Sequence, residues 1–277
     1  MTREAPLEQA CAYCAGRAYT YVVRFAEGVA VRCARCSLVR TLPYPSFDYG
    51  ETMHYIQGYA DQERLFRGMA RQFMLFVVRH ARGSDLLEIG SGMGFLLDEA
   101  RNHGFTARGL EMNRHEVAAT RARGLDVREG ALEQAGLPSH SVDVVCMSHV
   151  LEHVQDLRSL LSCVYRVLKP GGVLALSQPH YAAPLPRILR HLWLGWDFQR
   201  HVWHFDVPAL TPALAAHGLI HPVVEYNAMY HAWIPHPFSW RPKVLAVEVL
   251  KAGLSRTEPW LGYGDQFFLA AWRDDRL

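Results

Sequence analysis

The chain has 277 residues, half of them apolar, and its 29 basic and 27 acidic residues leave a formal net charge of +2. This length allows one well-cored domain plus a small module, and the near-balance of charge argues against a large nucleic-acid-binding surface. No apolar run approaches the roughly 20 residues that cross a bilayer. The first residues, MTREAPLEQA, lack the apolar segment of a secretion signal. A cytoplasmic protein that binds no membrane is therefore expected.

Four of the six cysteines form two C-x-x-C pairs, Cys11 with Cys14 and Cys33 with Cys36. Such pairs supply the four thiolates of a structural zinc site. The segment between them, YTYVVRFAEGVAVR, predicts two strands that turn at Glu27 and Gly28. Two disulfides are the alternative, which a reducing compartment disfavours. We therefore predict a zinc ribbon over residues 1–45, with a closed site that folds the module rather than carrying out chemistry.

Residues 46–84 are predicted to hold a linker and a helix. The stretch TLPYPSFDYG is broken by proline, and apolar residues recur at helical spacing from about 52 to 82, before Gly83. From residue 85 onward, strands alternate with helices, which indicates a parallel sheet covered on both faces. The expected strands are 85–90, 105–111, 125–130, 141–148 and 173–180, and the expected helices are 94–104, 115–124 and 156–172. The segments LIHPVVEYN and DQFFLAAWR predict two more strands at an antiparallel edge.

A glycine-rich loop follows the first strand of this alternation, in the stretch LLEIGSGMGFLL. Glycines allow the backbone to turn sharply and to approach a ligand closely. The spacing G-x-G-x-G departs from the G-x-G-x-x-G of dinucleotide-binding proteins, which disfavours a nicotinamide cofactor. Glu111 ends the second strand, where an acidic side chain accepts hydrogen bonds from ribose hydroxyls. Loop and acid together predict a nucleoside cofactor.

Several motifs in order resemble the class I methyltransferases that use S-adenosylmethionine. They are LLEIGSGMGFLL, ARGLEMN, LPSHSVDVVCMSHVLEHV and VYRVLKPGGVLAL, and the resemblance covers about residues 85–272. It implies an α/β, Rossmann-like fold with a seven-stranded sheet, and the cofactor across the carboxyl ends of the first strands. We therefore expect a methyltransferase domain over residues 85–277, with the zinc ribbon as a small N-terminal module.

The same resemblance implies a set of cofactor-binding residues. Gly90, Gly92 and Gly94 would lie beside the methionine part, Glu111 on the ribose, and Ala131 and Leu132 beside the adenine. Many relatives have an aspartate where Ala131 stands, so adenine recognition is expected to use backbone groups. Tyr59 precedes the first long helix, where relatives close a lid over the cofactor, and helix packing is the alternative for this residue. The expected set also includes Glu88, Met112 and Ser148.

The stretch from His149 to His153 reads H-x-x-E-H, which is also a zinc-protease pattern. A zinc protease places both histidines on one continuous helix, whereas His149 here ends a predicted strand. The protease interpretation is therefore rejected. At the end of a strand, His149 is expected to lie where the acceptor group meets the methyl group of the cofactor. As a general base it would increase the rate of methyl transfer by roughly 10²–10⁴-fold.

A metal site is the second hypothesis for these residues. The resemblance extends to methyltransferases, of the ubiquinone and small-RNA kinds, that hold a divalent cation with acid-x-x-Glu-His and a downstream histidine. Here His149 replaces the acid, Glu152 and His153 match, and His201 or His204 is the downstream candidate. Three histidines and one carboxylate favour zinc, iron or manganese over magnesium. The third interpretation is that the LEH triplet only shapes the chain. The predicted catalytic residues are His149, His153 and His201.

The leading functional prediction is O-methylation of a small-molecule hydroxyl, in a sugar or secondary metabolite. The D/N-P-P-Y pattern of amide methylation is absent after the fourth strand, and aromatic and basic residues crowd the segment 180–206. Alternatives are a C-methyltransferase, an RNA methyltransferase whose ribbon binds RNA, or a cofactor-binding partner without turnover. The ribbon carries too little positive charge for an extended RNA footprint. It is a candidate contact for a protein partner or a dimer.

Overall fold

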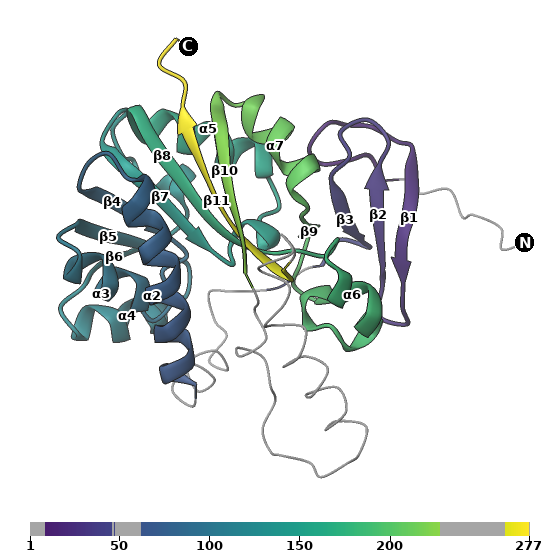
Figure 1. The fold of residues 1–277 in the computed structure, drawn as a ribbon, viewed down its shortest axis with the longest axis horizontal. Helices are drawn as coiled ribbons and strands as arrows, with labels where there is room; N and C mark the ends of the chain where they lie inside the picture. Colours follow the sequence, from purple (N-terminus) through teal and green to yellow (C-terminus); the bar gives the residue numbers. More distant parts are fainter. Residues whose placement is uncertain (1–8, 46, 48–61, 228–263, 277) are drawn as a thin grey trace, which may run out of the picture.

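The computed structural model describes residues 9–45, 47, 62–227 and 264–276 (Figure 1). Its main element is a seven-stranded sheet in the order β10-β11-β8-β7-β4-β5-β6. The strands are β4 (Asp85–Ile89), β5 (Thr106–Glu111), β6 (Asp126–Glu129), β7 (Val142–Ser148), β8 (Leu168–Pro179), β10 (Leu219–Asn227) and β11 (Gln266–Arg273). Strands β4 to β8 pair in parallel, while β11 pairs antiparallel with both β8 and β10. The predicted sheet, with its antiparallel edge, is confirmed.

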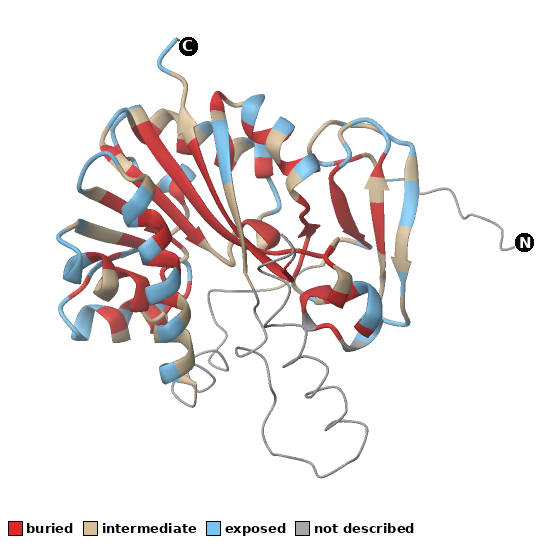
Figure 2. Cartoon of the chain, viewed as in Figure 1, coloured by how far each residue is buried: buried red, intermediate tan, exposed pale blue. Residues whose placement is uncertain are grey.

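Successive side chains of the central strands enter two different cores, one on each face of the sheet. Leu86, Val144 and Phe268 pack under one group of helices, while their neighbours Leu87, Val145 and Phe267 join the opposite core. This alternation is the consequence of the two-residue repeat of a strand that is buried on both faces. The first face is covered by α2 (Glu63–His80), α3 (Phe95–Asn102) and α4 (Arg114–Ala122), and the second by α5 (Leu157–Val167) and α7 (Val207–Ala215). Figure 2 shows burial concentrated in the central strands.

Short polar side chains fix where three of these helices begin. Asn113 accepts from the backbone N–H groups of His115 and Glu116 at the start of α4. Asp156 and Asp206 do the same for Ser159 and Ala209 at the starts of α5 and α7. Each cap satisfies amides that have no partner within the helix. The Asp206 cap also fixes the segment that precedes α7.

The cysteine module is a small sheet beside the main one, and it is not built from the N-terminal residues alone. Its strands β1 (Tyr19–Arg24), β2 (Val29–Cys33) and β3 (Val39–Leu42) are joined by β9 (Trp203–His204), in the order β1-β2-β3-β9. Strand β9 pairs Trp203 with Arg40 and His204 with Val39. We call β1, β2, β3 and the four paired cysteines the ribbon. Figure 1 shows the ribbon attached to the rest of the chain through β9.

Arg40 is a fully buried cation at the centre of the ribbon. Its guanidinium lies between the rings of Tyr19 and Tyr44, at 5.1 and 4.4 Å from their centroids. It also donates to the carbonyl oxygens of Gln9, at 3.1 Å, and Ala10, at 2.8 Å. A buried charge is tolerated when it is paired or well hydrogen-bonded, and these contacts tie β3 to the chain just before Cys11.

One secondary-structure prediction needs correction. The helix expected over 156–172 ends at Val167, and β8 already begins at Leu168. Pro170 has no N–H to continue a helix, and the β7–β8 register shifts between Val142 and Val144 as Lys169–Gly172 bulge out. The two strands expected between the cysteine pairs are confirmed as β1 and β2, and β3 is a further strand after them. The N-terminal part of the helix expected from residue 52, up to residue 61, lies outside the described residues.

Candidate active site

The glycine loop, Gly90–Gly94, leaves the carboxyl end of β4 and leads into α3. Gly90 and Gly94 have φ angles of 69° and 73°, in the left-handed region that glycine adopts without strain. A Cβ at Gly90 would lie 2.4 Å from Val150 Cγ2, and one at Gly94 would lie 2.7 Å from Leu125 and Thr120 methyl carbons. Side chains are therefore excluded at both positions, and the loop packs directly against the residues that follow β7.

Glu111 holds this loop in place from the end of β5. Its Oε2 accepts from the Gly92 N–H at 2.8 Å, and its Oε1 accepts from the Asn113 N–H at 2.9 Å. A carboxylate offers about four lone-pair directions, so both oxygens keep capacity for two neighbouring hydroxyl groups. The side chain is 9% exposed, at the edge where the parallel strands end. This is the geometry that ribose recognition requires.

Two further carboxyl groups lie close to Glu111, and both favour their protonated forms. Burial, followed by the charge of Glu111, raises the pKa of Glu116 to about 8. The same two causes raise the pKa of Glu88 well above its ordinary value. The carboxyl oxygens of Glu88 and Glu116 are shielded from solvent by burial, and Glu88 Oε2 has no hydrogen-bond partner among the described residues. The loop therefore lies beside two carboxyl groups that favour their neutral forms.

The other residues predicted to bind the cofactor lie along the same sheet edge. Ala131 precedes a 3₁₀ turn, Leu132–Gln134, and is partly exposed, whereas the Leu132 side chain is buried in the core. Met112 is 53% exposed beside Glu111. Ser148 ends β7, paired in register with Ser177 of β8. Tyr59 lies outside the described residues.

His149 has an unusual backbone conformation at the end of β7. Its φ is 55°, and its N–H donates to the Ser177 carbonyl at 3.0 Å. A left-handed conformation costs free energy for any residue with a Cβ, and such positions cluster at functional sites. The side chain lies with Nδ1 3.3 Å from Glu152 Oε1 and Nε2 3.3 Å from the amide nitrogen of Gln266.

Glu152, His153 and His201 form a group whose candidate ligand atoms all lie within 4.8 Å of one another. Glu152 and His153 belong to a 3₁₀ turn, Leu151–His153, so the histidines of H-x-x-E-H do not share a helix, as the rejection of the protease required. His153 Nδ1 lies 3.2 Å from the Arg200 carbonyl and His201 Nδ1 lies 3.0 Å from the Gly195 carbonyl. Because a carbonyl accepts only from N–H, each Nε2 carries the lone pair, as in metal-bound histidines.

The charges of this group suit a cation. Burial lowers the pKa of His201 to about 4, assisted by His153, and burial also lowers the pKa values of His153 and His204. Burial alone would raise the pKa of Glu152, but His149 and the charges of the other histidines lower it to about 2. Near neutral pH the group thus has neutral imidazoles and one anionic carboxylate. In the described part of the chain, His149 Nδ1 lies 3.3 Å from Glu152 Oε1, whereas Oε2 has no hydrogen-bond partner.

The side chains around this group are packed so closely that the crevice between them has no room for a water molecule. The crevice is lined by Glu152, Pro179, Tyr181, Trp193, Gly195, His201, Trp203, His204 and Phe205. Trp203 and Phe205 are almost completely buried and belong to the hydrophobic core. His204, the other downstream histidine that the sequence offered, lies with Nε2 2.9 Å from Thr41 Oγ1 of the ribbon and is not part of the three-residue group.

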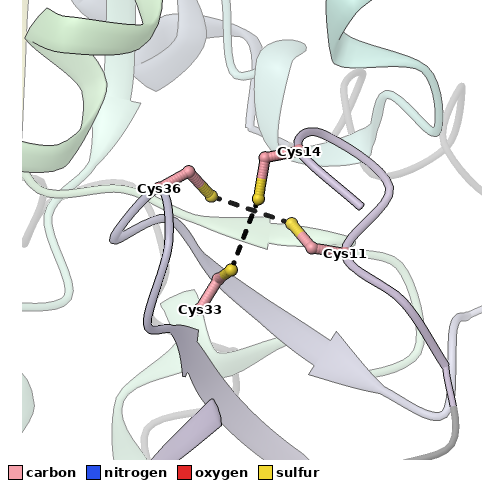
Figure 3. Close-up of side chains that lie close together, drawn as sticks. All are labelled: Cys11, Cys14, Cys33 and Cys36. Atoms are coloured by element: carbon pink, nitrogen blue, oxygen red, sulfur yellow. Dashed lines mark hydrogen bonds between the residues drawn. The ribbon is translucent and has the colours of Figure 1, made fainter. Parts of the chain in front are cut away.

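The four ribbon cysteines point toward one another as free thiols (Figure 3). The Sγ atoms of Cys11 and Cys36 lie 3.7 Å apart, and those of Cys14 and Cys33 lie 3.5 Å apart. Four sulfurs at the usual Zn–S distance of about 2.3 Å from a tetrahedral ion are about 3.8 Å apart. The cluster therefore has the geometry of a tetrathiolate zinc site, and disulfides, which need about 2 Å, are absent.

The sequence analysis did not identify one segment that contacts residues around the site, at the start of β11. Gly264, Asp265 and Gln266 lie at the start of β11. The Gly264 carbonyl lies 2.9 Å from His180 Nδ1, and Asp265 accepts from Trp193 Nε1 at 3.2 Å. The nearest signal in the sequence was the polar pair before FFLAAWR, which has no spacing relation to the histidines. Only the pairing of β11 with β8 brings them together.

The strand order and the loop at the carboxyl end of β4 define a Rossmann-like methyltransferase fold. A family model described as a methyltransferase domain matches residues 61–220, more than half of the chain, which therefore belongs to this family of S-adenosylmethionine-dependent enzymes. Among the described residues, no helix combines the length and apolar character needed to cross a membrane.

Named relatives share only part of the chain. A probable S-adenosylmethionine-dependent methyltransferase of Mycolicibacterium smegmatis is 37% identical over 127 residues, covering 45% of this chain and 49% of that protein. A ubiquinone biosynthesis O-methyltransferase of Paramagnetospirillum magneticum is 32% identical over 129 residues, which cover 43% of this chain and 51% of that protein. The chain thus spans about half the length of these relatives. A methyltransferase structure from Thermotoga maritima superposes with a TM-score of 0.59 at 18% identity, covering 80% of this chain and 97% of that one, which supports the fold alone.

Proposed function

We propose that the protein transfers the methyl group of S-adenosylmethionine to a hydroxyl oxygen of a small molecule. The observation that carries this proposal is Glu152, a buried carboxylate grouped with two histidines. It follows Val150, whose side chain lies against Gly90, by two residues. Its Oε2 has no hydrogen-bond partner among the described residues, and such a buried oxygen is costly unless a ligand completes it. The similarity to a ubiquinone O-methyltransferase supports oxygen as the acceptor atom.

In this proposal the glycine loop binds the methionine part of the cofactor and Glu111 binds the ribose. Glu88, Met112, Ala131, Leu132 and Ser148 complete the site, together with Tyr59. The division into a ribbon (1–45), a linker with a lid helix (46–84) and a cofactor-binding domain (85–277) is part of the same proposal.

The transfer is an in-line displacement. The acceptor oxygen attacks the methyl carbon, the carbon–sulfur bond breaks, and S-adenosylhomocysteine leaves as a neutral thioether. The hydroxyl proton goes to Nε2 of His149, which follows the last residue of β7 and precedes Val150, whose side chain lies against Gly90. Most of the rate enhancement then comes from alignment of the two reactants, to which the base adds roughly 10²–10⁴-fold.

Two metal sites belong to this proposal. The ribbon cysteines hold a structural zinc ion, for which their spacing is suited. Glu152, His153 and His201 would hold a second divalent cation, because two imidazoles and one carboxylate are ligand types that divalent transition metals accept. His149 contacts this set through Glu152 rather than as one of its three members. The second cation would polarise the acceptor hydroxyl.

The test is product formation with S-adenosylmethionine labelled with ¹³C in its methyl group and a panel of phenols, catechols and sugars. We expect mass spectrometry to find a labelled methyl ether and an equal amount of S-adenosylhomocysteine, both lost in His149→Ala. His115→Ala, which changes a histidine outside the site, is the matched control. A methyl group on carbon would replace this proposal by the C-methyltransferase alternative. Failure to bind the cofactor in calorimetry would refute both.

A further inference from the structure

Thr120 is a fully buried residue of α4 whose side chain contacts the glycine loop with both of its branches. The hydroxyl group donates to the Gly92 carbonyl at 3.0 Å. The methyl carbon Cγ2 lies 2.7 Å from the place that a Cβ on Gly94 would take, so the methyl group packs directly on the glycine backbone. These contacts tie the loop after β4 to the helix that follows the next strand, β5.

The hydroxyl hydrogen of Thr120 has two carbonyl groups within reach. The Glu116 carbonyl, one turn earlier in α4, lies 2.6 Å from Oγ1, and the Gly92 carbonyl lies 3.0 Å from it. The Glu116 carbonyl belongs to the helix, where the N–H four residues later is its regular donor. The Gly92 carbonyl belongs to a buried residue outside the helix, so a side chain has to take the place of such a donor.

Gly92 is thus held at both of its backbone polar groups. Its N–H donates to Glu111 Oε2 at 2.8 Å, and its carbonyl accepts from Thr120. Glycine has more backbone conformations open to it than any other residue, and the two contacts restrict them before a ligand arrives. A loop that is already in its binding conformation binds more tightly, because less conformational entropy is lost on binding.

Arg123, just after α4, contacts the neighbouring peptide group of the loop. It donates to the Met93 carbonyl and to Asp98 of α3. Arg123 is exposed, so water competes for both of its contacts, whereas Thr120 is shielded from water. The contact of Thr120 with Gly92 is therefore the one from this helix that should matter most for the loop.

We propose that Thr120 is a positioning residue for the cofactor: its hydroxyl group holds the Gly92 peptide group in the orientation in which the glycine loop binds the methionine part of S-adenosylmethionine. This inference rests on the proposed function, which places the methionine part at the loop. Thr120 acts through Gly92 and not on the reacting atoms. Without the hydroxyl group, the Gly92 peptide group has other orientations open to it, and a ligand has to select the binding one.

The first test follows the Gly92 carbonyl by NMR in the full-length, zinc-loaded protein without any ligand. Glycine labelled with ¹³C in its carbonyl group, together with ¹⁵N-labelled methionine, gives correlations only at the Gly68–Met69 and Gly92–Met93 peptide bonds. Gly68→Ala, at an exposed position, assigns the two signals. Thr120→Val keeps the shape of the side chain and removes the hydroxyl group. The Gly92 carbonyl signal should then move upfield because a hydrogen bond is lost, while the Gly68 signal stays in place.

The second test is calorimetry with S-adenosylhomocysteine and with adenosine, which lacks the methionine part. Thr120→Val should bind S-adenosylhomocysteine about fivefold more weakly, the effect of one hydrogen bond, and adenosine as tightly as the unmodified protein does. Thr120→Ser, which keeps the hydroxyl group, should resemble the unmodified protein in both tests. Thr106→Val, the same change at an exposed position at the start of β5, is the matched control. If valine prevents folding, Thr120→Ser and Thr120→Ala form a second pair that differs only in the hydroxyl group.

The possible outcomes separate this inference from the proposed function. An unmodified protein that binds both ligands, with a Gly92 signal that Thr120→Val leaves unchanged, would overturn the inference alone. An equal loss of affinity for S-adenosylhomocysteine and adenosine would also overturn it, because the effect would then not involve the methionine part. An unmodified protein that binds neither ligand would refute the proposed function, and with it the role of Thr120 toward the cofactor.

Discussion

The glycine-loop region and the histidine group have opposite preferences for protons, although they touch at Gly90 and Val150. Near the loop, burial raises the pKa of Glu116 to about 8, so the folded chain favours the protonated form and loses stability as pH rises from about 4.5 to 8. In the histidine group, burial lowers the pKa of His201 to about 4, so the folded chain favours the neutral ring and loses stability as pH falls from 6.5 toward 4.

The two regions also differ in how the sequence builds them. The loop region is one continuous stretch, from β4 to the turn after β6, whose parts are neighbours along the chain. The histidine group draws on the residues after β7, the segment before β9, the start of β11 and, through Thr41, the ribbon. We therefore expect the loop region to keep its structure when a distant part of the chain is disrupted. The histidine group should lose its structure, because its residues come from several distant segments. Three experiments test this, and we take the largest expected effect first.

Loss of the zinc site should disrupt the histidine group and spare the loop region. Strand β3 pairs with β9, whose neighbour Val202 donates to the Glu152 carbonyl at 2.7 Å. Cys33→Ser should therefore abolish zinc binding and expose Trp203, with a red-shifted tryptophan emission. Cofactor affinity should change by no more than about twofold, because the loop is a separate unit. Cys163→Ser, outside the cluster, is the control. Parallel loss of cofactor binding would contradict the comparison.

Removal of Glu111 should do the reverse. Glu111→Ala leaves the Gly92 and Asn113 amides without their acceptor and removes the proposed ribose contact. Charged hydrogen bonds contribute about 1.5–3 kcal/mol each, so calorimetry should show S-adenosylmethionine bound about 100-fold more weakly. Zinc content should stay at the level of the unmodified protein. Glu133→Ala, an exposed glutamate after β6, should leave both properties unchanged.

Glu116→Gln should have the smallest effect of the three substitutions. It tests whether burial of the Glu116 carboxyl makes the free energy of unfolding depend on pH. An amide removes the cost of charging a buried carboxyl group, so the variant should be more stable than the unmodified protein by about 1–3 kcal/mol at pH 8. The difference should vanish below about pH 3.5, where the carboxyl is protonated in both states. Urea unfolding at the two pH values measures this, with Glu133→Gln as the matched control. A variant that is less stable at pH 8 would refute the assignment.

The loop region could be predicted from the sequence because its signals are local. The glycine spacing, the acid at Glu111 and the alternation of strands and helices all lie within about 50 residues. Each of these patterns predicts the structure of the segment in which it occurs. The histidine group could be predicted only in part. His149, Glu152 and His153 were visible as a motif, and His201 was one of two downstream candidates.

The remaining contacts depend on pairings between distant segments. Nothing in the letters around Gln266 indicates that β11 inserts between β10 and β8 with this residue opposite Pro179. The same holds for β9, a two-residue strand whose existence depends on an edge offered by β3. A strand of two residues is too short to show a periodic pattern in the sequence. The pairing of β9 with β3 therefore becomes visible only in the folded structure.

The buried guanidinium of Arg40 couples the cysteine cluster to the sheet of the ribbon. It holds the carbonyls of Gln9 and Ala10, just before Cys11, from a position on β3. Strand β3 is also the strand on which β9 pairs. A metal ion held by the cysteines would therefore stabilise, through this one side chain, the edge on which a distant segment of the chain is anchored.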